Sequence, residues 1–229
     1  MGTAVSSDGP NREVRYYKKD FWREENLKFD RVHYRMEKAA RVINKVVHGR
    51  DCELLDVGCG PAALRQVLPG NIRYHGIDIA IQEPADYLIE ADFLEAPIKF
   101  RDKKFDVVLA QGVFEYMGEH QAQKFDEIAR LLKAGGTFIA TYVNFAHRNR
   151  EVYKPYSNVQ PISSFRADLS RNFVIRRSFP TSHNWGHSEP NKKVVRTANI
   201  HLNASIPLIS KFLAVEYFFI CSPRRPVSL

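Results

Sequence analysis

Three aspartates in the first half of the chain each accompany a short apolar run. Asp56 lies within the run at residues 53–57, while Asp78 and Asp92 close the runs at residues 73–77 and 87–90. If these runs are strands of a parallel sheet, their carboxyl ends meet at one edge, where open α/β sheets bind ligands. A carboxylate in that position can accept hydrogen bonds from both hydroxyls of a ribose. The spacing therefore predicts a binding crevice for a nucleoside-type ligand.

A glycine turn separates the first two aspartates. The segment Gly58-Cys59-Gly60-Pro61-Ala62-Ala63 satisfies a GxGxxA pattern between an apolar run and a helix-like segment. Glycines in such a turn let the backbone approach a ligand closely, and the following helix offers unpaired N–H groups. Asp78 lies 20 residues beyond Gly58, which is the separation expected for a ribose-binding acid.

The apolar patterns around these residues predict alternating strands and helices. Apolar residues recur every three or four positions within residues 20–47, which predicts one or two helices. Further helices are expected at residues 62–68, 122–132 (ending at Gly135-Gly136) and 162–169, and strands at residues 53–57, 73–77, 87–90, 105–110, 137–143, 173–179 and 214–221. This alternation indicates βαβ units and a mostly parallel sheet.

At this level of detail the sequence resembles the class I S-adenosylmethionine-dependent methyltransferases. LLDVGCGPAAL, HGIDIA and EADFLEAP are similar to the first three motifs of that family, and FDVVLAQGVFEYM and LLKAGGTFIATYV to its fourth and fifth strand regions. The resemblance covers about residues 20–143. It implies a Rossmann-like, doubly wound, mostly parallel seven-stranded sheet flanked by helices, with an N-terminal helical cap.

The resemblance also implies S-adenosyl-L-methionine as the cofactor. Asp56 and the glycine turn would lie near its amino-acid portion, Asp78 on the ribose, and Asp92 at the adenine amino group. The aromatic segment at residues 16–22 would close over the ligands as part of the cap. The expected cofactor-binding residues are Asp56, Gly58, Cys59, Gly60, Pro61, Asp78, Ile79, Asp92, Phe93, Gln111 and Tyr17.

Two features depart from the family pattern. Only about eight residues, Pro84 among them, join Asp78 to Tyr87, so the second crossover helix must be very short. Many relatives have Glu-His where this chain has Glu115-Tyr116. Any role that the histidine plays in those relatives must be filled differently here.

Two other classes of protein share parts of this pattern. A nicotinamide-dependent oxidoreductase also has a GxGxxA turn, but the chain has no Tyr-x-x-x-Lys after it and too little length for a separate catalytic domain. A non-catalytic binding module would keep the sheet and lose the chemistry. Both remain open, as less favoured alternatives to an enzyme.

The methyl acceptor is less constrained than the cofactor. After the fourth strand, Gln111-Gly112-Val113-Phe114 replaces the Asn/Asp-Pro-Pro-aromatic tetrapeptide of nucleobase amino methyltransferases. We therefore expect O-methylation of a sugar or specialised-metabolite hydroxyl, with RNA methylation and small-molecule N-methylation as alternatives. An alcohol must lose its proton near the transition state. The candidate bases are His183, His147 and Glu115, in that order.

Charge and composition limit the partners and the compartment that we expect. The 229 residues carry a net charge of +8, and basic residues are frequent in the second half, which suits an acceptor with a phosphate or other anionic group. No apolar run is long enough for a membrane span, no secretory signal is visible, and the three cysteines have no metal-binding spacing. We expect no metal and no membrane partner, a cytoplasmic biosynthetic enzyme, and a single domain. That domain divides into a tail and helical cap (residues 1–48), a cofactor-binding half (49–143) and an acceptor-side half (144–229).

Overall fold

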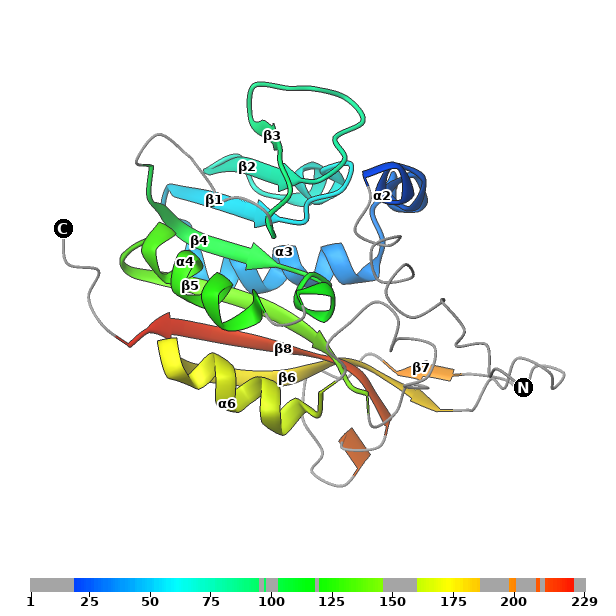
Figure 1. Ribbon diagram of the computed structural model, residues 1–229, viewed down its shortest axis with the longest axis vertical. Helices are drawn as coiled ribbons and strands as arrows, with labels where there is room; N and C mark the ends of the chain where they lie inside the picture. The colour runs from blue at the N-terminus through cyan, green and yellow to red at the C-terminus, as the bar shows by residue number, and fades with distance from the viewer. Residues whose placement is uncertain are drawn as a thin grey trace, which may run out of the picture.

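One mixed β-sheet forms the centre of the computed structural model, with its strands in the order β3-β2-β1-β4-β5-β8-β6-β7 (Figure 1). The structure describes residues 19–94, 97, 103–117, 120–145, 160–185, 198–200, 209–210 and 213–224. The strands are β1 (Cys52–Val57), β2 (Ile72–Asp78), β3 (Leu88–Glu90), β4 (Phe105–Ala110), β5 (Leu132–Val143), β6 (Phe173–Trp185), β7 (Ala198–Ile200) and β8 (Ala214–Pro223).

Strands β1 to β5 pair in parallel, whereas β8 runs antiparallel to both β5 and β6. The mostly parallel, Rossmann-like sheet predicted from the sequence is therefore confirmed. Seven strands form the expected sheet, and the three-residue β7 adds an eighth at the β6 edge.

Helices cover both faces of the sheet. The α-helices are α2 (Lys19–Asn26), α3 (Tyr34–Val47), α4 (Gln121–Leu131) and α6 (Ile162–Asn172), and the 3₁₀ helices are η1 (Leu27–Phe29), η2 (Ala63–Val67) and η3 (Phe114–Tyr116). Helix α3 lies on one face, and α4 and α6 lie on the other (Figure 1). None of these described helices combines the length and apolar character required to cross a membrane.

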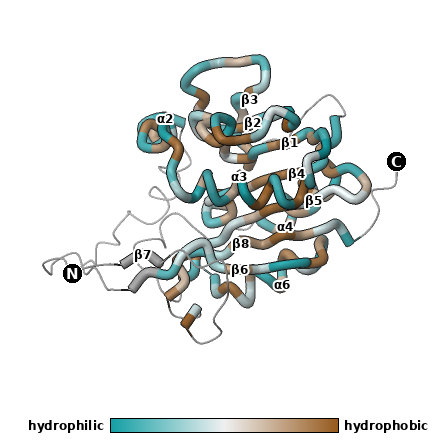
Figure 2. The backbone as a smooth tube through the Cα atoms, turned by 180° about the vertical axis from the view of Figure 1, so that it is seen from behind, coloured by the Kyte–Doolittle hydropathy of each residue, from teal (hydrophilic) through white to brown (hydrophobic). Residues whose placement is uncertain are grey.

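The alternation of side chains along β1 explains why helices cover both faces of the sheet. Leu54 packs in the core cluster that contains the buried face of α3, whereas Leu55 and Val57 pack in the cluster that contains Phe125 of α4 and Phe165 of α6. Both faces of the central strands are thus apolar, as parallel strands with helices on each side require. Figure 2 shows the resulting band of hydrophobic strands behind the more polar outer side of α3.

Three expectations about local structure need correction or refinement. The segment after the glycine turn, expected to be a helix over residues 62–68, is the five-residue 3₁₀ helix η2. No helix forms in the crossover at residues 79–87. Helix α4 ends at Leu131, and Gly135-Gly136 lies within β5, where the pairing with β4 shifts register between Phe105 and Val107.

Candidate active site

A pocket of about 400 Å³ opens at the carboxyl ends of the parallel strands. The structure brings ten of the predicted cofactor-binding residues to its lining, namely Asp56, Gly58, Cys59, Gly60, Pro61, Asp78, Ile79, Asp92, Phe93 and Gln111. Tyr17 lies outside the described residues. Strands far apart in sequence thus place the motif residues around one cavity, as the edge rule for open α/β sheets requires.

The glycine turn forms one wall of this pocket largely with its backbone. The amides of Gly58 and Cys59 donate hydrogen bonds to the Ile77 carbonyl at 2.8 and 3.2 Å, so the turn is anchored to β2. Gly58 has a φ of +70°, and a Cβ placed there would come within 2.5 Å of the Val113 Cγ2 atom. A side chain at this position would therefore be strained and would also push on the loop after β4.

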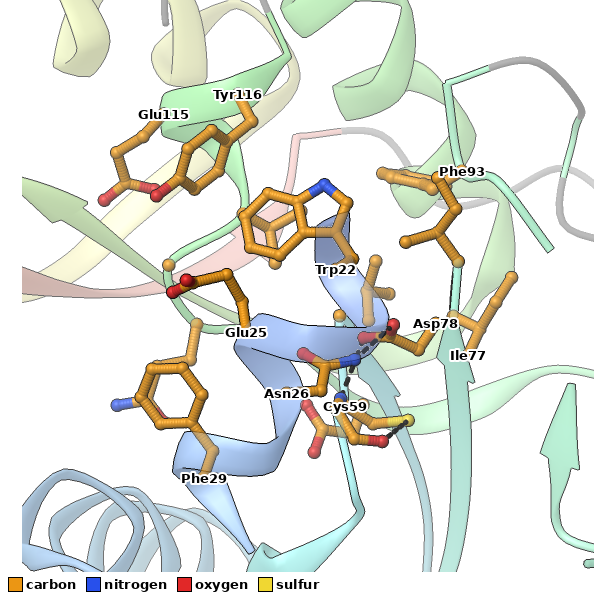
Figure 3. Close-up of a pocket in the computed structure, with 18 of the residues that line it drawn as sticks. Trp22, Glu25, Asn26, Phe29, Cys59, Ile77, Asp78, Phe93, Glu115 and Tyr116 are labelled. Atoms are coloured by element: carbon orange, nitrogen blue, oxygen red, sulfur yellow. Dashed lines mark hydrogen bonds between the residues drawn. The ribbon is translucent and has the colours of Figure 1, made fainter. Parts of the chain in front are cut away.

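Asp78 is buried at the end of β2 and is already held by three donors. Its Oδ1 accepts hydrogen bonds from the Asn26 side-chain amide at 3.0 Å and from the Ala80 amide at 2.9 Å. Its Oδ2 accepts from the Gly60 amide at 2.8 Å. Burial raises the pKa of Asp78, and these hydrogen bonds oppose that shift. The acid predicted to meet the ribose thus also fastens the last residue of α2 to the pocket (Figure 3).

The other two aspartates occupy different environments. Asp56 is buried and accepts a hydrogen bond from the Tyr74 hydroxyl at 2.8 Å; burial raises its pKa to about 7. Asp92 is only partly buried, and its Oδ1 accepts from the Leu94 amide at 2.8 Å. Phe93 is buried beside it, with the Lys124 ammonium 4.6 Å from the centre of its ring. Asp56 can therefore ionise when a cation arrives near neutral pH.

Helix α2 and η1 cover the pocket from the outside. Trp22, Glu25, Asn26 and Phe29 all line it. The Trp22 ring meets the Tyr116 ring edge-on at a centroid distance of 5.0 Å, and Figure 3 shows the indole between Tyr116 and Phe93. The expected N-terminal cap therefore includes these two elements.

A second wall of the pocket carries three ionisable side chains. Glu115 follows β4 and is buried, Arg35 lies near the start of α3, and Glu216 is buried in β8. The Arg35 Nη2 donates to Glu216 Oε1 at 2.5 Å, and the Val143 amide donates to Glu115 Oε1 at 2.9 Å. All three residues line the pocket.

Two polar atoms on this wall have no hydrogen-bond partner within the described residues. They are Glu115 Oε2 and Arg35 Nε. Arg35 is paired with Glu216, and within the part of the chain that the structure describes Glu115 has no ion-pair partner of its own. Burial, followed by repulsion from Glu216, raises the pKa of Glu115 to about 8, although Arg35 acts in the opposite direction. A buried carboxyl with one unpaired oxygen at a pocket wall can accept a proton from a bound molecule.

The structure does not place either candidate histidine in the pocket. His183 is buried in β6, with its Nε2 2.8 Å from the Ser210 hydroxyl, and it is not among the residues that line the pocket. His147 lies outside the described residues. Of the three proposed bases, the structure therefore places Glu115 in the pocket. Within the described chain, no cluster of three or more His, Cys, Asp or Glu side chains is arranged to hold a metal ion.

Sequence reasoning missed Asn26, Arg35 and Glu216. A signal for two of them was present. Arg35 precedes Ala39 by four residues on the buried face of a helix, and Glu216 interrupts an otherwise apolar strand. A charged residue in such a position usually has a partner or a ligand. Asn26 gives no comparable signal, because it ends an exposed polar helix.

Comparison with known proteins finds a family match in the part of the chain that carries the motif residues of the pocket. Residues 55–140 match a family described as a methyltransferase domain. That segment runs from β1 into β5 and includes the glycine turn, Asp78, Asp92 and Glu115. No curated protein matches the chain significantly.

Several solved structures share the fold. They include the N-methyltransferase NodS from Bradyrhizobium japonicum in complex with S-adenosyl-L-homocysteine (TM-score 0.56, 11% identity, 95% of this chain and 98% of that chain). A SAM-dependent methyltransferase from Archaeoglobus fulgidus gives a TM-score of 0.55 at 15% identity, covering 81% and 91% of the two chains. A TehB-like SAM-dependent methyltransferase from Corynebacterium glutamicum gives 0.52 at 16% identity, covering 94% and 100%. At these identities the likeness establishes the fold.

Proposed function

From the premise that the chain is a class I S-adenosylmethionine-dependent methyltransferase, we propose that it methylates a hydroxyl group of a small molecule. The carrying observation is the buried Glu115 carboxyl, which faces the pocket with one unpaired oxygen among the described residues. The proposal assigns this carboxyl the role of proton acceptor.

The pocket has features that fit the cofactor. S-adenosylmethionine supplies an electrophilic methyl group on its sulfonium sulfur. Gly58 packs so closely against Val113 that no side chain fits there, which fixes the shape of the glycine turn beside the pocket. Asp78 would hold the ribose hydroxyls, and Asp56 would lie near the amino-acid portion. The pKa of Asp56, about 7, allows it to ionise when a positive charge arrives.

Glu115 supplies what an alcohol acceptor requires. A hydroxyl is a poor nucleophile until its proton is removed, and a carboxyl whose pKa is raised to about 8 is a stronger base than an exposed one. The Val143 amide fixes one carboxyl oxygen, which leaves the other to receive the proton. Arg35 keeps Glu216 paired and thereby limits the negative charge beside Glu115.

The dimensions of the pocket favour a small acceptor group. About 400 Å³ is near the lower end of small-molecule sites, ~300–1,000 Å³, and the cofactor must share this space. The Trp22–Tyr116 contact narrows the site on the cap side. A hydroxyl on a slender molecule fits these limits better than a base within a folded RNA.

N-methylation is the second candidate, because carboxyl groups outnumber basic side chains in the lining of the pocket, and such a lining attracts an amine. An amine can be presented neutral and needs no base before methyl transfer. The two reactions therefore differ in how strongly they depend on Glu115.

A substrate panel tests the proposal. The full chain is incubated with methyl-labelled donor and with sets of small molecules matched in size, each set containing a hydroxyl, an amine and an unsubstituted member, together with a transcript pool of small RNAs. O-methylation would be supported if the label is transferred to the molecules that carry a hydroxyl and not to the matched molecules that lack it. Transfer confined to amines or to RNA would overturn it in favour of those alternatives.

A further inference from the structure

A second cavity lies beside the active site, between the exposed side of α3 and strands β6 and β8. Its volume is about 580 Å³. The residues that matter here are Tyr34, Lys38, Arg41 and Lys45 from α3, and Arg177 and Phe179 from β6. We refer to this cavity as the basic groove.

Positive charge lines both sides of the basic groove. Lys38, Arg41 and Lys45 are spaced by three and four residues, so they share one face of α3, and Arg177 reaches the groove from β6. Glu37 is the acidic residue of the lining, and it already pairs with Arg41 at 3.5 Å. Within the described residues, neither Lys45 nor Arg177 forms an ion pair with an acid. Like charges around a hollow repel one another and favour an anion between them.

The floor of the groove is held in place independently of any ligand. The buried Lys38 ammonium donates to the backbone carbonyls of Pro180, at 3.1 Å, and Thr181. The buried Phe179 ring lies 5.8 Å from this ammonium and 5.0 Å from the Arg177 guanidinium. Lys38 and Arg177 are thus positioned beside a buried aromatic ring, which lowers the ordering cost of binding.

The size and composition of the groove favour a small anion over a nucleic-acid strand. Its volume is that of a small-molecule site. Single-stranded RNA binding uses an extended basic track with exposed aromatic rings on which bases stack. Phe179 is only 6% exposed, so it cannot serve as such a platform.

The basic groove adjoins the active site. Tyr34 lines both cavities. On the strand side, the Thr181 hydroxyl donates to the Glu216 carbonyl at 3.2 Å, and the Glu216 side chain faces the active-site pocket. A molecule that reaches past Tyr34 would therefore place one end near Glu115 and the other among the four cations.

We propose that the basic groove binds a phosphate-bearing end of the methyl acceptor. This inference rests on the proposed function, and it narrows the acceptor to molecules whose methylated hydroxyl lies some distance from a phosphate or diphosphate. The active-site pocket is acidic and would repel the anion. The anion would therefore lie in the basic groove, and the reacting hydroxyl would lie in the active-site pocket on the other side of Tyr34.

Binding of inorganic pyrophosphate tests the groove itself, without any turnover. Calorimetric titration of the full chain with pyrophosphate at low ionic strength is expected to give saturable binding. The double variant Lys45→Ser/Arg177→Ser should weaken it at least about tenfold, because two charge-assisted contacts are lost. The same variant should bind S-adenosyl-L-homocysteine normally, which shows that the fold is intact.

Arg176→Ser is the matched control. Arg176 is exposed and adjacent to Arg177, but it donates to the Ser222 hydroxyl at 2.9 Å and does not line the groove. Pyrophosphate affinity should stay within about twofold in this variant. No saturable binding by the unaltered chain, or an equal loss in the Arg176→Ser variant, would overturn the assignment. Tighter binding of a short single-stranded RNA, lost in the double variant, would reassign the groove to nucleic acid.

The link to the acceptor is tested separately, with a substrate found in the panel and its dephosphorylated form. The double variant should raise KM for the phosphorylated form about tenfold or more, with kcat and the KM of the dephosphorylated form unchanged. Equal effects on both forms would overturn the link. If no hydroxyl substrate exists, the pyrophosphate titration still decides whether the groove binds anions, so failure of the proposed function and failure of the groove are distinguishable.

Discussion

The wall of the active-site pocket formed by residues 56–61 and Asp78 is largely backbone with two carboxyl groups, whereas a second wall carries the side chains of Arg35, Glu115 and Glu216. The first wall comes from a continuous stretch of chain and its neighbouring strand. The second joins residues up to 181 positions apart. One wall is therefore encoded locally and suits a cofactor shared across a family, while the other depends on how distant elements meet and can vary with the acceptor.

The largest effect is expected for Glu115→Gln. This variant should lose the proton transfer that we assign to the second wall and keep the cofactor binding that we assign to the first. Loss of the proton acceptor is expected to lower kcat about 10²–10⁴-fold, with donor affinity unchanged. Glu25→Gln is the control, because Glu25 also lines the pocket but pairs with Lys28 at the surface. Steady-state kinetics and donor titration check both variants. A Glu115→Gln enzyme with normal turnover would leave the second wall without a catalytic role.

Gly58→Ala should damage the first wall. The new Cβ would lie 2.5 Å from Val113 Cγ2 at a φ of +70°. Strain and overpacking together are expected to weaken donor binding on the order of thirtyfold. Gly49→Ala separates the two causes, because Gly49 has a φ of +73° but nothing within 4 Å of its Cβ. Equal donor affinities in the two variants, measured by calorimetry, would contradict a close approach at Gly58.

Asp78→Ala should have a smaller effect on the same wall. The variant loses charge-assisted hydrogen bonds to the cofactor and also releases Asn26, so donor affinity is expected to fall about tenfold. Asp86→Ala, at an exposed position in the same crossover, is the control. Unchanged donor affinity in the Asp78 variant, with a normal melting temperature, would remove Asp78 from the cofactor site.

The smallest predicted effect is on stability. Folding raises the pKa of Glu115 from 4.5 to about 8, so the folded chain holds this proton more tightly than the unfolded chain does. The resulting stabilisation is complete below pH 4.5 and is lost as pH rises through about 8. Between pH 6 and pH 9, wild type should therefore lose on the order of a few degrees more in Tm than Glu115→Gln. Parallel Tm curves in thermal melts would contradict a buried, proton-binding Glu115.

Most of the first wall could be predicted from the sequence. The glycine turn, Asp56, Asp78 and Asp92 lie at or just beyond the ends of strands whose apolar runs are clear, and the topology of a parallel sheet then places these ends together. Local details failed where tertiary structure decided the outcome. The residues after the turn form a 3₁₀ helix, and Gly135-Gly136 belongs to β5 because the chain pairs with β4 directly after α4.

The second wall could be predicted only in part. Glu115 was a candidate because it follows the fourth strand, but its ionisation depends on its burial and then on Glu216 and Arg35, which no local pattern connects to it. His183 was the first-ranked base, yet it is buried against Ser210 and away from the pocket. The pairing of β6 with β8 shifts register beside His183, and such irregularities break the simple alternation from which side-chain direction is inferred. The basic groove likewise takes three of its four cations from α3, although the sequence drew attention to the second half.

The pH dependence of a single turnover tests the central claim most directly. Enzyme is mixed with saturating donor and acceptor at a series of pH values from 6 to 9. The rate of methyl transfer is measured for wild type and for Glu115→Gln. If Glu115 accepts the proton, the wild-type rate should rise with pH, reach half of its maximum near pH 8, where half of the carboxyl is ionised, and level off above that pH, and the variant should lack this rise. A flat wild-type profile, or an identical rise in the variant, would contradict the account.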